Sequence, residues 1–164
     1  MARLAIYELD AILSDSPTPP SVRVRAFNHL LGECGVSFCA SPKLAAKYRR
    51  KFPHSLNGAP FLLPLADTSL RRSLDRWLEE TGIRINLRGE FADSSLLKAF
   101  GQIGAGIFVV PTAIETEVCR QYHVKVLGRV DAIRERFYLI SVERKLKQPT
   151  VAAIAEMARG KLFD

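Results

Sequence analysis

Cysteine is scarce in this 164-residue chain, and no two cysteines are spaced as a CxxC motif. Cys34, Cys39 and Cys119 make an odd number, which disfavours a disulfide scaffold and favours reduced thiols. Long hydrophobic runs are also lacking, because none approaches the roughly 20 residues that a membrane-spanning helix needs. The first residues include an acidic side chain and do not resemble a signal peptide. We therefore expect a cytoplasmic chain that has no membrane partner.

Motifs for common enzyme and metal sites are absent as well. The chain contains no GxSxG, GxxxxGK[ST], HExxH or EF-hand pattern. Its three histidines lie far apart in the sequence, and none has a partner at the spacing of zinc ligands. The acidic pairs Glu79–Glu80 and Glu115/Glu117 fall on helix faces that are expected to point to water. The sequence therefore predicts no catalytic residue and no cofactor, and it assigns no metal ligand.

The composition is that of a folded protein. Hydrophobic residues make up 48% of the chain and charged residues 25%, so a core can form without disulfides or metal. The 24 basic residues outnumber the 17 acidic ones, and the net charge of +7 permits a polyanionic partner. The basic residues come in short groups, such as the one at 47–51. Solvated helix faces are the main interpretation of these groups, and a nucleic-acid surface is the alternative.

Strand-like and helix-like segments alternate along the chain. Apolar or alternating runs predict strands at 10–14, 22–27, 35–40, 61–63, 83–87, 104–110, 124–127 and 136–142. Polar or proline-containing starts predict helices that begin at 41–42, 67–69, 93–95, 111–112 and 149. This alternation predicts an α/β fold with largely parallel sheets.

Spacing also predicts local details within the helices. Ser41 is expected to cap the helix that Pro42 begins, and Thr112 with Glu115 has the spacing of a capping box. The helix that starts at 93–95 is expected to turn four apolar side chains inward, namely Leu96, Leu97, Phe100 and Ile103.

Three polar helix starts are the best candidates for a ligand site. They comprise Thr68 and Ser69, then Asp93, Ser94 and Ser95, then Pro111 and Thr112. In open α/β sheets, ligands bind outside the carboxyl ends of the strands. The free N–H groups at a helix start favour an anionic or polar guest. The alternative is plain capping, in which these side chains bond only to their own backbone. Three such starts in one α/β chain favour a binding module.

Several strings of the sequence resemble the effector-binding half of LysR-type transcriptional regulators. They are LAIYELDAILSDSP, VRVRAFNHLLGECGVSFCASPKLA and FADSSLLKAFGQIGAGIFVVP. The strings ETEVCRQY and FYLISVERKLKQP look most like the NhaR subgroup of that family, which activates sodium/proton antiporter genes in response to sodium. The resemblance covers essentially the whole chain.

The resemblance implies a type 2 periplasmic-binding-protein-like fold with two lobes. Residues 1–32 and 132–164 would be the remnant of the first effector lobe, and 33–131 would be the second lobe. The effector cleft of the family lies between the lobes, and the helix starts named above match its second-lobe wall. The winged helix-turn-helix of the family is not found in this sequence, so the chain looks like a fragment. DNA would be bound only through that absent domain, and the full-length protein would form a homo-oligomer.

A sodium-responsive chain would need oxygen ligands, because sodium is a hard cation. Asp67, Asp93 and nearby backbone carbonyls could supply them, whereas the positive end of a helix dipole opposes a cation. The resemblance thus implies a small ligand or an ion such as sodium, without naming its ligands. A stand-alone solute-binding protein of the same architecture is the alternative. A small enzyme that uses the same cleft is a further alternative, although no group of acid, base and nucleophile supports it.

Overall fold

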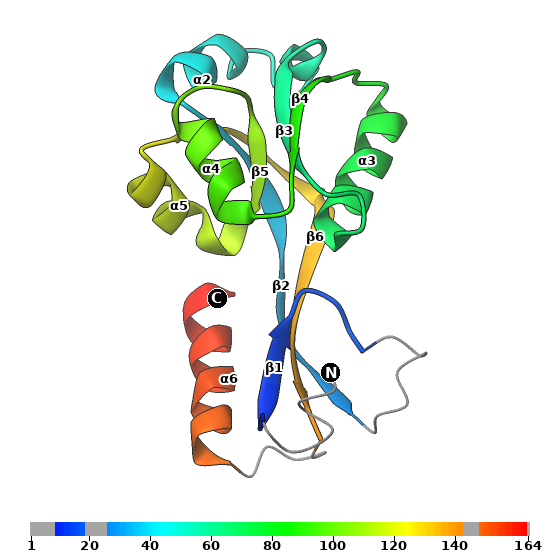
Figure 1. The fold of residues 1–164 in the computed structure, drawn as a ribbon, viewed down its shortest axis with the longest axis vertical. Coiled ribbons are helices and arrows are strands. Elements are labelled where there is room, and N and C mark those ends of the chain that lie inside the picture. The colour runs from blue at the N-terminus through cyan, green and yellow to red at the C-terminus, as the bar shows by residue number, and fades with distance from the viewer. Residues whose placement is uncertain (1–8, 19–25, 143–147, 164) are drawn as a thin grey trace. The chain divides into compact units, whose positions relative to one another are not determined.

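The computed structural model describes residues 9–18, 26–142 and 148–163, apart from the side chains of Lys161 and Leu162 (Figure 1). In chain order, its elements are β1 (Ala11–Ser14), β2 (Phe27–Ala40), α2 (Pro42–Tyr48), the 3-10 helix η1 (His54–Leu56), β3 (Pro60–Pro64), α3 (Ser69–Thr81), β4 (Asn86–Phe91), α4 (Ser94–Gln102), β5 (Phe108–Pro111), the 3-10 helix η2 (Thr112–Ile114), α5 (Glu115–Tyr122), β6 (Lys125–Ser141) and α6 (Pro149–Leu162). The alternation of strands and helices confirms the predicted α/β class. None of the helices in these residues is long and apolar enough to span a bilayer.

The described strands form a four-stranded sheet in the order β1-β6-β2-β5 and a two-stranded sheet of β3 and β4. β3 and β4 are parallel, whereas β1 pairs with β6 and β2 pairs with β5 in antiparallel fashion. A parallel bridge between Phe61 and Ile107 links β3 to the residue just before β5. The expectation of largely parallel sheets is therefore wrong. A strand buried on both faces, such as β5, is typical of parallel sheets, but burial alone does not fix the direction of its neighbour.

By its internal contacts the chain divides into two units. Unit 1 comprises residues 1–34 and 135–164, and unit 2 comprises residues 35–134. Both boundaries fall inside strands, so β2 and β6 each contribute to both units. Parts of the first-lobe remnant expected from the sequence, including 1–8 and 19–25, lie outside the described residues. The strand predicted at 22–27 falls largely on them, and β2 begins at its last residue, Phe27. The assignment of effector lobes and the cleft expected between them stay predictions.

The core of unit 2 has two sides because successive side chains of a strand point to opposite faces. In β3, Phe61 and Leu63 pack in one buried cluster and Leu62 in the other. In β2, Phe38 belongs to the first cluster and Cys39 to the second. α3 covers the first side, where it buries Leu74, Trp77 and Leu78. α4 and α5 cover the other side (Figure 1).

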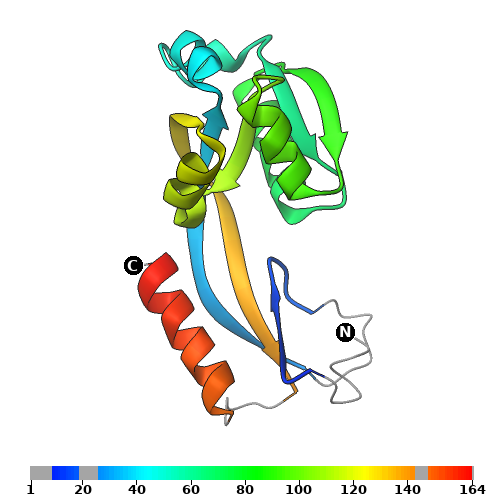
Figure 2. The same cartoon turned by 60° about the vertical axis from the view of Figure 1, so that its left-hand side comes forward.

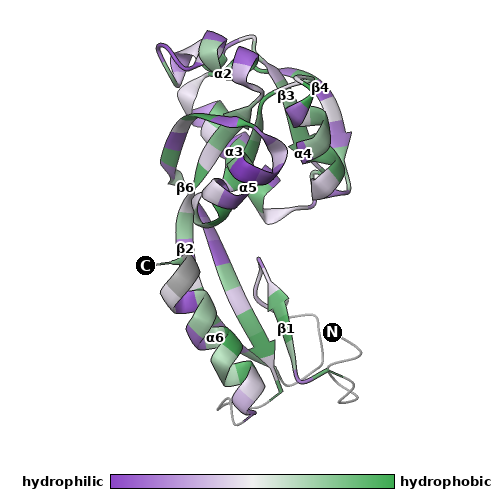
Figure 3. Ribbon diagram, turned by 90° about the vertical axis from the view of Figure 1, so that its left-hand side faces the viewer, coloured by the Kyte–Doolittle hydropathy of each residue, from purple (hydrophilic) through white to green (hydrophobic). Residues whose placement is uncertain are grey.

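The core of unit 1 is smaller. α6 packs Val151 and Ala155 against Leu31 of β2 and Leu139 of β6. Figure 2 shows α6 running beside these strands, and Figure 3 shows hydrophobic residues along β1 and a mixture of both kinds along α6. Such a mixture fits a helix that buries one stripe and exposes the other.

Several predicted strands have different bounds in the structure. Only the last two residues of the alternating run at 83–87 lie in a strand, because β4 begins at Asn86. Gly82 ends α3 in the left-handed region at φ 68°, and the N–H of Ile83 then bonds back to the carbonyl of Leu78 at 3.1 Å. Ile83 is buried by this helix end rather than by strand pairing. The runs at 124–127 and 136–142, predicted as two strands, fall mainly in a single strand, β6, which continues through the residues between them.

α4 meets the sheet through a narrower face than the sequence predicts. Leu97 is buried as expected, but Leu96, Phe100 and Ile103 are 57%, 45% and 77% exposed. The contact runs through Leu97 and Gly101 instead, which are four residues apart. A Cβ at Gly101 would lie 2.3 Å from the ring of Phe108, so glycine is needed for this close approach. The expected inward stripe of four apolar residues is therefore wrong for three of them.

Candidate functional site

Three helices of unit 2 begin at one edge of its strands. β3 and β4 are parallel with Pro64 opposite Phe91, so α3 and α4, which follow them, start on the same side. The N–H of Leu65 donates to the carbonyl of Phe91 at 3.2 Å and ties the two strand ends together. The parallel bridge between Phe61 and Ile107 places the carboxyl end of β5, and with it η2, at the same edge. The structure thus brings the three predicted helix starts to one place.

At the start of α3, Thr68 caps the helix. Its hydroxyl accepts a hydrogen bond from the N–H of Arg71 at 3.2 Å and donates one to the carbonyl of Leu65 at 3.0 Å. Both functions of the hydroxyl are therefore engaged by the local backbone. Ser69, the first helical residue, is half-buried.

Replacing Thr68 by alanine removes this cap, and we expect the free energy of unfolding to fall by about 1 kcal/mol. Urea denaturation of the T68A chain measures the loss. Thr116→Ala on the exposed side of α5 is the matched control, and we expect it to cost less than about 0.5 kcal/mol. Equal losses in the two variants would show that the cap contributes nothing.

At the start of α4, Asp93 is the N-cap. Its Oδ1 accepts hydrogen bonds from the N–H groups of Ser95 at 2.6 Å and Leu96 at 3.0 Å. These bonds, that of Leu96 first, hold the pKa of the Asp93 carboxyl below its ordinary value. Both bonds go to one oxygen, so Oδ2 takes no part in the cap. Asp93, Ser94 and Ser95 are all exposed.

At the third start, Pro111 and Thr112 form the junction of β5 and η2, and both are half-buried. The capping box expected from Thr112 and Glu115 is wrong, because η2 and α5 have no side-chain cap. The cap predicted from Ser41 is also absent, although α2 begins at Pro42 as expected. In both cases the polar residue has the right spacing but its side chain does not bond to the helix start.

Glu115 instead joins three elements of unit 2. Its carboxylate forms a two-pronged ion pair with Arg129 of β6, at 2.6 and 2.7 Å, and accepts a hydrogen bond from the hydroxyl of Ser37 in β2. Its side chain is only 13% exposed, so the expectation that it points to water is wrong. The hydrogen bonds from Arg129, followed by that from Ser37, lower the pKa of Glu115. This contact holds the start of α5, and the turn before it, against the sheet.

The thiols near Glu115 are poor nucleophiles. Burial raises the pKa of Cys39 strongly, and the neighbouring thiol of Cys119 raises it further. Burial likewise raises the pKa of Cys119. Within the described residues, no group of three or more His, Cys, Asp or Glu side chains could hold a metal ion.

Arg71 is a residue of this edge that the sequence analysis did not identify as part of the site. Its guanidinium donates to Asp75 at 2.9 and 3.0 Å, to Glu90 at 2.5 Å and to the carbonyl of Pro64 at 2.9 Å. Burial disfavours its charge, but the hydrogen bonds that it donates to Glu90 and Asp75 raise the pKa of Arg71 above its ordinary value. Arg71 therefore fixes the first turn of α3 to the ends of β3 and β4. The four-residue spacing of Arg71 and Asp75 was the only sequence pattern that could have indicated the contacts of Arg71, because Glu90 lies 19 residues away.

A groove of about 590 Å³ lies between α3 and β4. Arg71, Asp75, Glu79 and Arg84 supply its charged groups, and leucine and isoleucine side chains line the rest. None of the predicted effector-binding residues lines it. Arg71, in the first turn of α3, is a residue of both the edge and the groove, so the groove adjoins the α3 start without including the predicted residues.

Comparison with known proteins gives consistent matches over the whole chain. The LysR substrate binding domain family matches residues 1–162. The transcriptional activator protein NhaR of Escherichia coli (strain K12) is 33% identical over 165 aligned residues, which cover 100% of this chain and 54% of NhaR. This chain thus spans about half the length of the curated relatives that it matches.

Solved structures show the same fold at low sequence identity. The reduced form of the OxyR2 regulatory domain from Vibrio vulnificus has a TM-score of 0.71 and 16% identity, over 98% of this chain and 76% of that one. DarR from Vibrio fischeri, solved in complex with DNA, has a TM-score of 0.66 and 14% identity, over 96% of this chain and 53% of that one. The matches confirm the resemblance drawn from the sequence and the type 2 periplasmic-binding-protein-like fold that it implies.

Proposed function

Because the chain belongs to the LysR substrate-binding domain family, we propose that it is the effector-sensing domain of a transcriptional activator similar to NhaR. In this proposal the whole protein responds to sodium and activates sodium/proton antiporter genes. It binds DNA through a domain outside this chain and acts as a homo-oligomer in the cytoplasm.

The observation that carries the proposal is the convergence of three helix starts on one strand edge. Thr68 and Ser69, Asp93 to Ser95, and Pro111 with Thr112 are the proposed effector-binding residues. Free N–H groups at such starts can bind polar groups of a ligand. The Thr68 hydroxyl and one Asp93 oxygen are engaged in capping, so the backbone and the remaining oxygens would provide the contacts.

Sodium would have to bind through oxygen atoms at this edge. The Oδ2 atom of Asp93 lies outside the cap, and Asp67 is exposed two residues before the start of α3. The carbonyl of Asp67 already accepts a hydrogen bond from Arg72 at 2.6 Å, so the carboxylates are the better ligands. Their negative charge would have to outweigh the positive ends of the α3 and α4 dipoles.

The mechanism would be a shift in population between two conformations of the domain. An effector changes such an equilibrium only by the difference between its affinities for the two conformations. The same difference then sets how strongly DNA binding and effector binding are coupled in the whole protein.

We expect a sodium titration of this chain to produce saturable amide shifts at 67–69, 93–96 and 112, with choline chloride keeping the ionic strength constant. NMR spectra of the labelled chain give these shifts residue by residue. Asp93→Asn should remove the sodium-specific shifts at 94–96 and leave α4 folded, because asparagine is also a good N-cap.

Asp10→Asn is the matched control, since Asp10 is exposed and lies outside unit 2. It should leave the sodium response unchanged. The absence of sodium-specific shifts, or an undiminished response in the D93N chain, would contradict a sodium site at this edge.

The alternatives from the sequence make different predictions. A stand-alone solute-binding protein would bind its ligand without being attached to a DNA-binding domain. The similarity to NhaR and DarR supports a regulator instead. An enzyme would need an acid, base or nucleophile at the edge, and the lowered pKa of the Asp93 carboxyl disfavours a general acid there.

A further inference from the structure

The basic charge of the chain is concentrated in one segment. Residues 41–66 contain five Lys and Arg residues and no Asp or Glu. The rest of the chain holds 19 basic and 17 acidic residues, which nearly balance. Most of the net charge of +7 therefore comes from this segment.

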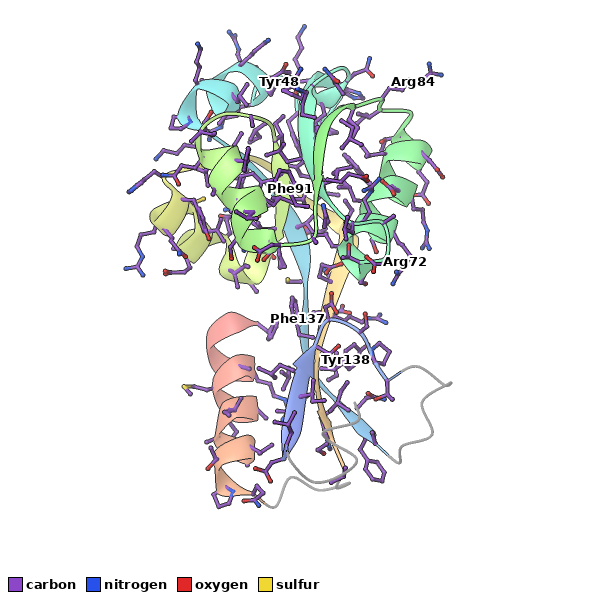
Figure 4. All side chains as sticks on the ribbon, viewed as in Figure 1. Tyr48, Arg72, Arg84, Phe91, Phe137 and Tyr138 are labelled. Atoms are coloured by element: carbon purple, nitrogen blue, oxygen red, sulfur yellow. The ribbon has the colours of Figure 1, made fainter. Side chains whose placement is uncertain are left out.

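The structure places these five residues on α2 and the turn that follows it. All five are exposed, and we call them the α2 basic surface: Lys43, Lys47, Arg49, Arg50 and Lys51. Blue-tipped side chains project outward from this end of unit 2, where Tyr48 is labelled in Figure 4. Figure 3 colours the turn after α2 as hydrophilic.

The α2 basic surface is anchored by the apolar side chains on the inner face of α2 and the turn after it. Ala45 is buried, and Leu44, Tyr48 and Phe52 pack against the first core cluster of unit 2. The hydroxyl of Ser55 also donates to the carbonyl of Tyr48 at 2.5 Å, which fixes the turn after the helix. The five cations are thus presented by an anchored element.

Within the described residues, no carboxylate forms an ion pair with the cations of the α2 basic surface, whereas Arg71, Arg120 and Arg129 of unit 2 are paired. The charge of the surface is therefore available to a partner.

We propose that the α2 basic surface binds the phosphate backbone of duplex DNA without reading its bases. Lys43 and Lys47 are one helical turn apart, about 6 Å along the axis, so they can contact different phosphates. Arginine and lysine positioned in this way supply phosphate contacts, which carry affinity but no sequence information.

The aromatic residues of the segment favour a duplex over a single strand. Single-stranded nucleic acid is bound by stacking its bases on exposed aromatic rings. Tyr48 and Phe52 pack inward instead, and Lys47 already lies 5.0 Å above the ring of Tyr48. The nearby amide of Asn57 is engaged as well, because its oxygen accepts from the N–H of Arg84.

The choice of DNA over an acidic protein rests on the proposed function. A domain attached to a promoter-bound protein meets duplex DNA at a high effective concentration, so even weak phosphate contacts become occupied. DNA also carries one charge per about 1.7 Å of its axis, which is denser than an acidic polypeptide offers.

The test is fluorescence anisotropy of this chain with a labelled duplex of arbitrary sequence at several salt concentrations. We expect a dissociation constant of roughly 10⁻⁴–10⁻⁶ M and a slope of log K against log salt near −4. Lys43→Glu with Lys47→Glu should weaken binding at low salt by about tenfold or more and make the slope shallower by about 2.

Arg72→Glu with Arg76→Glu is the matched control. Both arginines are exposed on α3, have the same four-residue spacing and give the same change of net charge. We expect less than about a threefold loss of affinity from this control, with circular dichroism confirming that both variants fold.

Equal losses in the two double variants would overturn the proposal, because binding would then follow net charge alone. Tighter binding of a single strand, or equal binding of polyglutamate at matched charge, would also overturn it. The sodium titration does not depend on this surface, so failure of the DNA experiment leaves the proposed effector function standing, and the reverse also holds.

Discussion

Replacing Phe38 by alanine is expected to lower the free energy of unfolding by about 3–5 kcal/mol. Phe38 lies in β2 and is fully buried. Its ring centroid is 5.4 Å from that of Phe52, 6.1 Å from that of Phe61 and 5.5 Å from that of Trp77. Alanine would leave a cavity among three large rings that lie on separate segments, namely the turn after α2, β3 and α3, so they cannot all close onto it.

Chemical denaturation monitored by tryptophan fluorescence measures this loss, since Trp77 itself packs on Phe38. Phe100→Ala is the matched control, because Phe100 is 45% exposed on α4 and touches only the edge of the second cluster. We expect the control to cost less than about 1.5 kcal/mol. Comparable losses in the two variants would mean that the aromatic cluster around Phe38 does not organise the core of unit 2.

The parts of the site that sequence reasoning predicts well are local ones. The starts of α3 and α4 and the end of α3 at Gly82 follow from caps whose partners are two to five residues away. The convergence of these starts on one edge follows from the parallel pairing of β3 and β4. Local chemistry and one topological rule therefore suffice for this edge.

The failed capping box is explained by competition from distant partners. Thr112 and Glu115 have capping-box spacing, but Arg129 and Ser37 offer Glu115 a charge-assisted pair and a buried hydroxyl. Those partners lie 14 and 78 residues away, so no local pattern reveals them. A two-pronged ion pair with good geometry outweighs a local cap because charged hydrogen bonds are stronger than neutral ones.

The edge residue Arg71 illustrates the same limit. Its pairing with Asp75 can be read from helical spacing, but the bonds to Glu90 and to the Pro64 carbonyl depend on how β4 returns beside β3.

The prediction of the buried face of α4 failed for another reason. Helical periodicity gives the direction of an apolar stripe only to within one residue. The close contact between Gly101 and Phe108 selects the face of α4 that carries Leu97.

Glu135 is expected to make the protein less stable as the pH rises from about 5 to 8. Its side chain lies in β6, the residue is 3% exposed, and its Oε1 is buried without a hydrogen-bond partner among the described residues. Burial, followed by the negative charge of Asp15, raises the pKa of Glu135 from 4.5 to about 7. The native protein therefore keeps a proton that the unfolded chain releases.

The sign of the effect follows from this difference in bound protons. The contribution of Glu135 to stability is fully present below pH 4.5, where both states are protonated, and it is lost as the pH rises through about 7. A rise in pKa of this size corresponds to about 3 kcal/mol, as an order of magnitude. Asp93 and Glu115 have lowered pKa values, so their contributions are lost only below their ordinary values and do not act in this window.

Glu135→Gln should therefore raise the free energy of unfolding at pH 8 by up to about 3 kcal/mol and change it little at pH 5. Urea denaturation at the two pH values measures both differences. Glu33→Gln is the matched control, because Glu33 forms an exposed ion pair with Arg136 at 3.0 Å and such pairs contribute less than about 1 kcal/mol. If the E135Q and wild-type proteins lose stability in parallel between pH 5 and 8, Glu135 does not hold its proton in the native state, and its carboxylate must then be solvated or paired in solution.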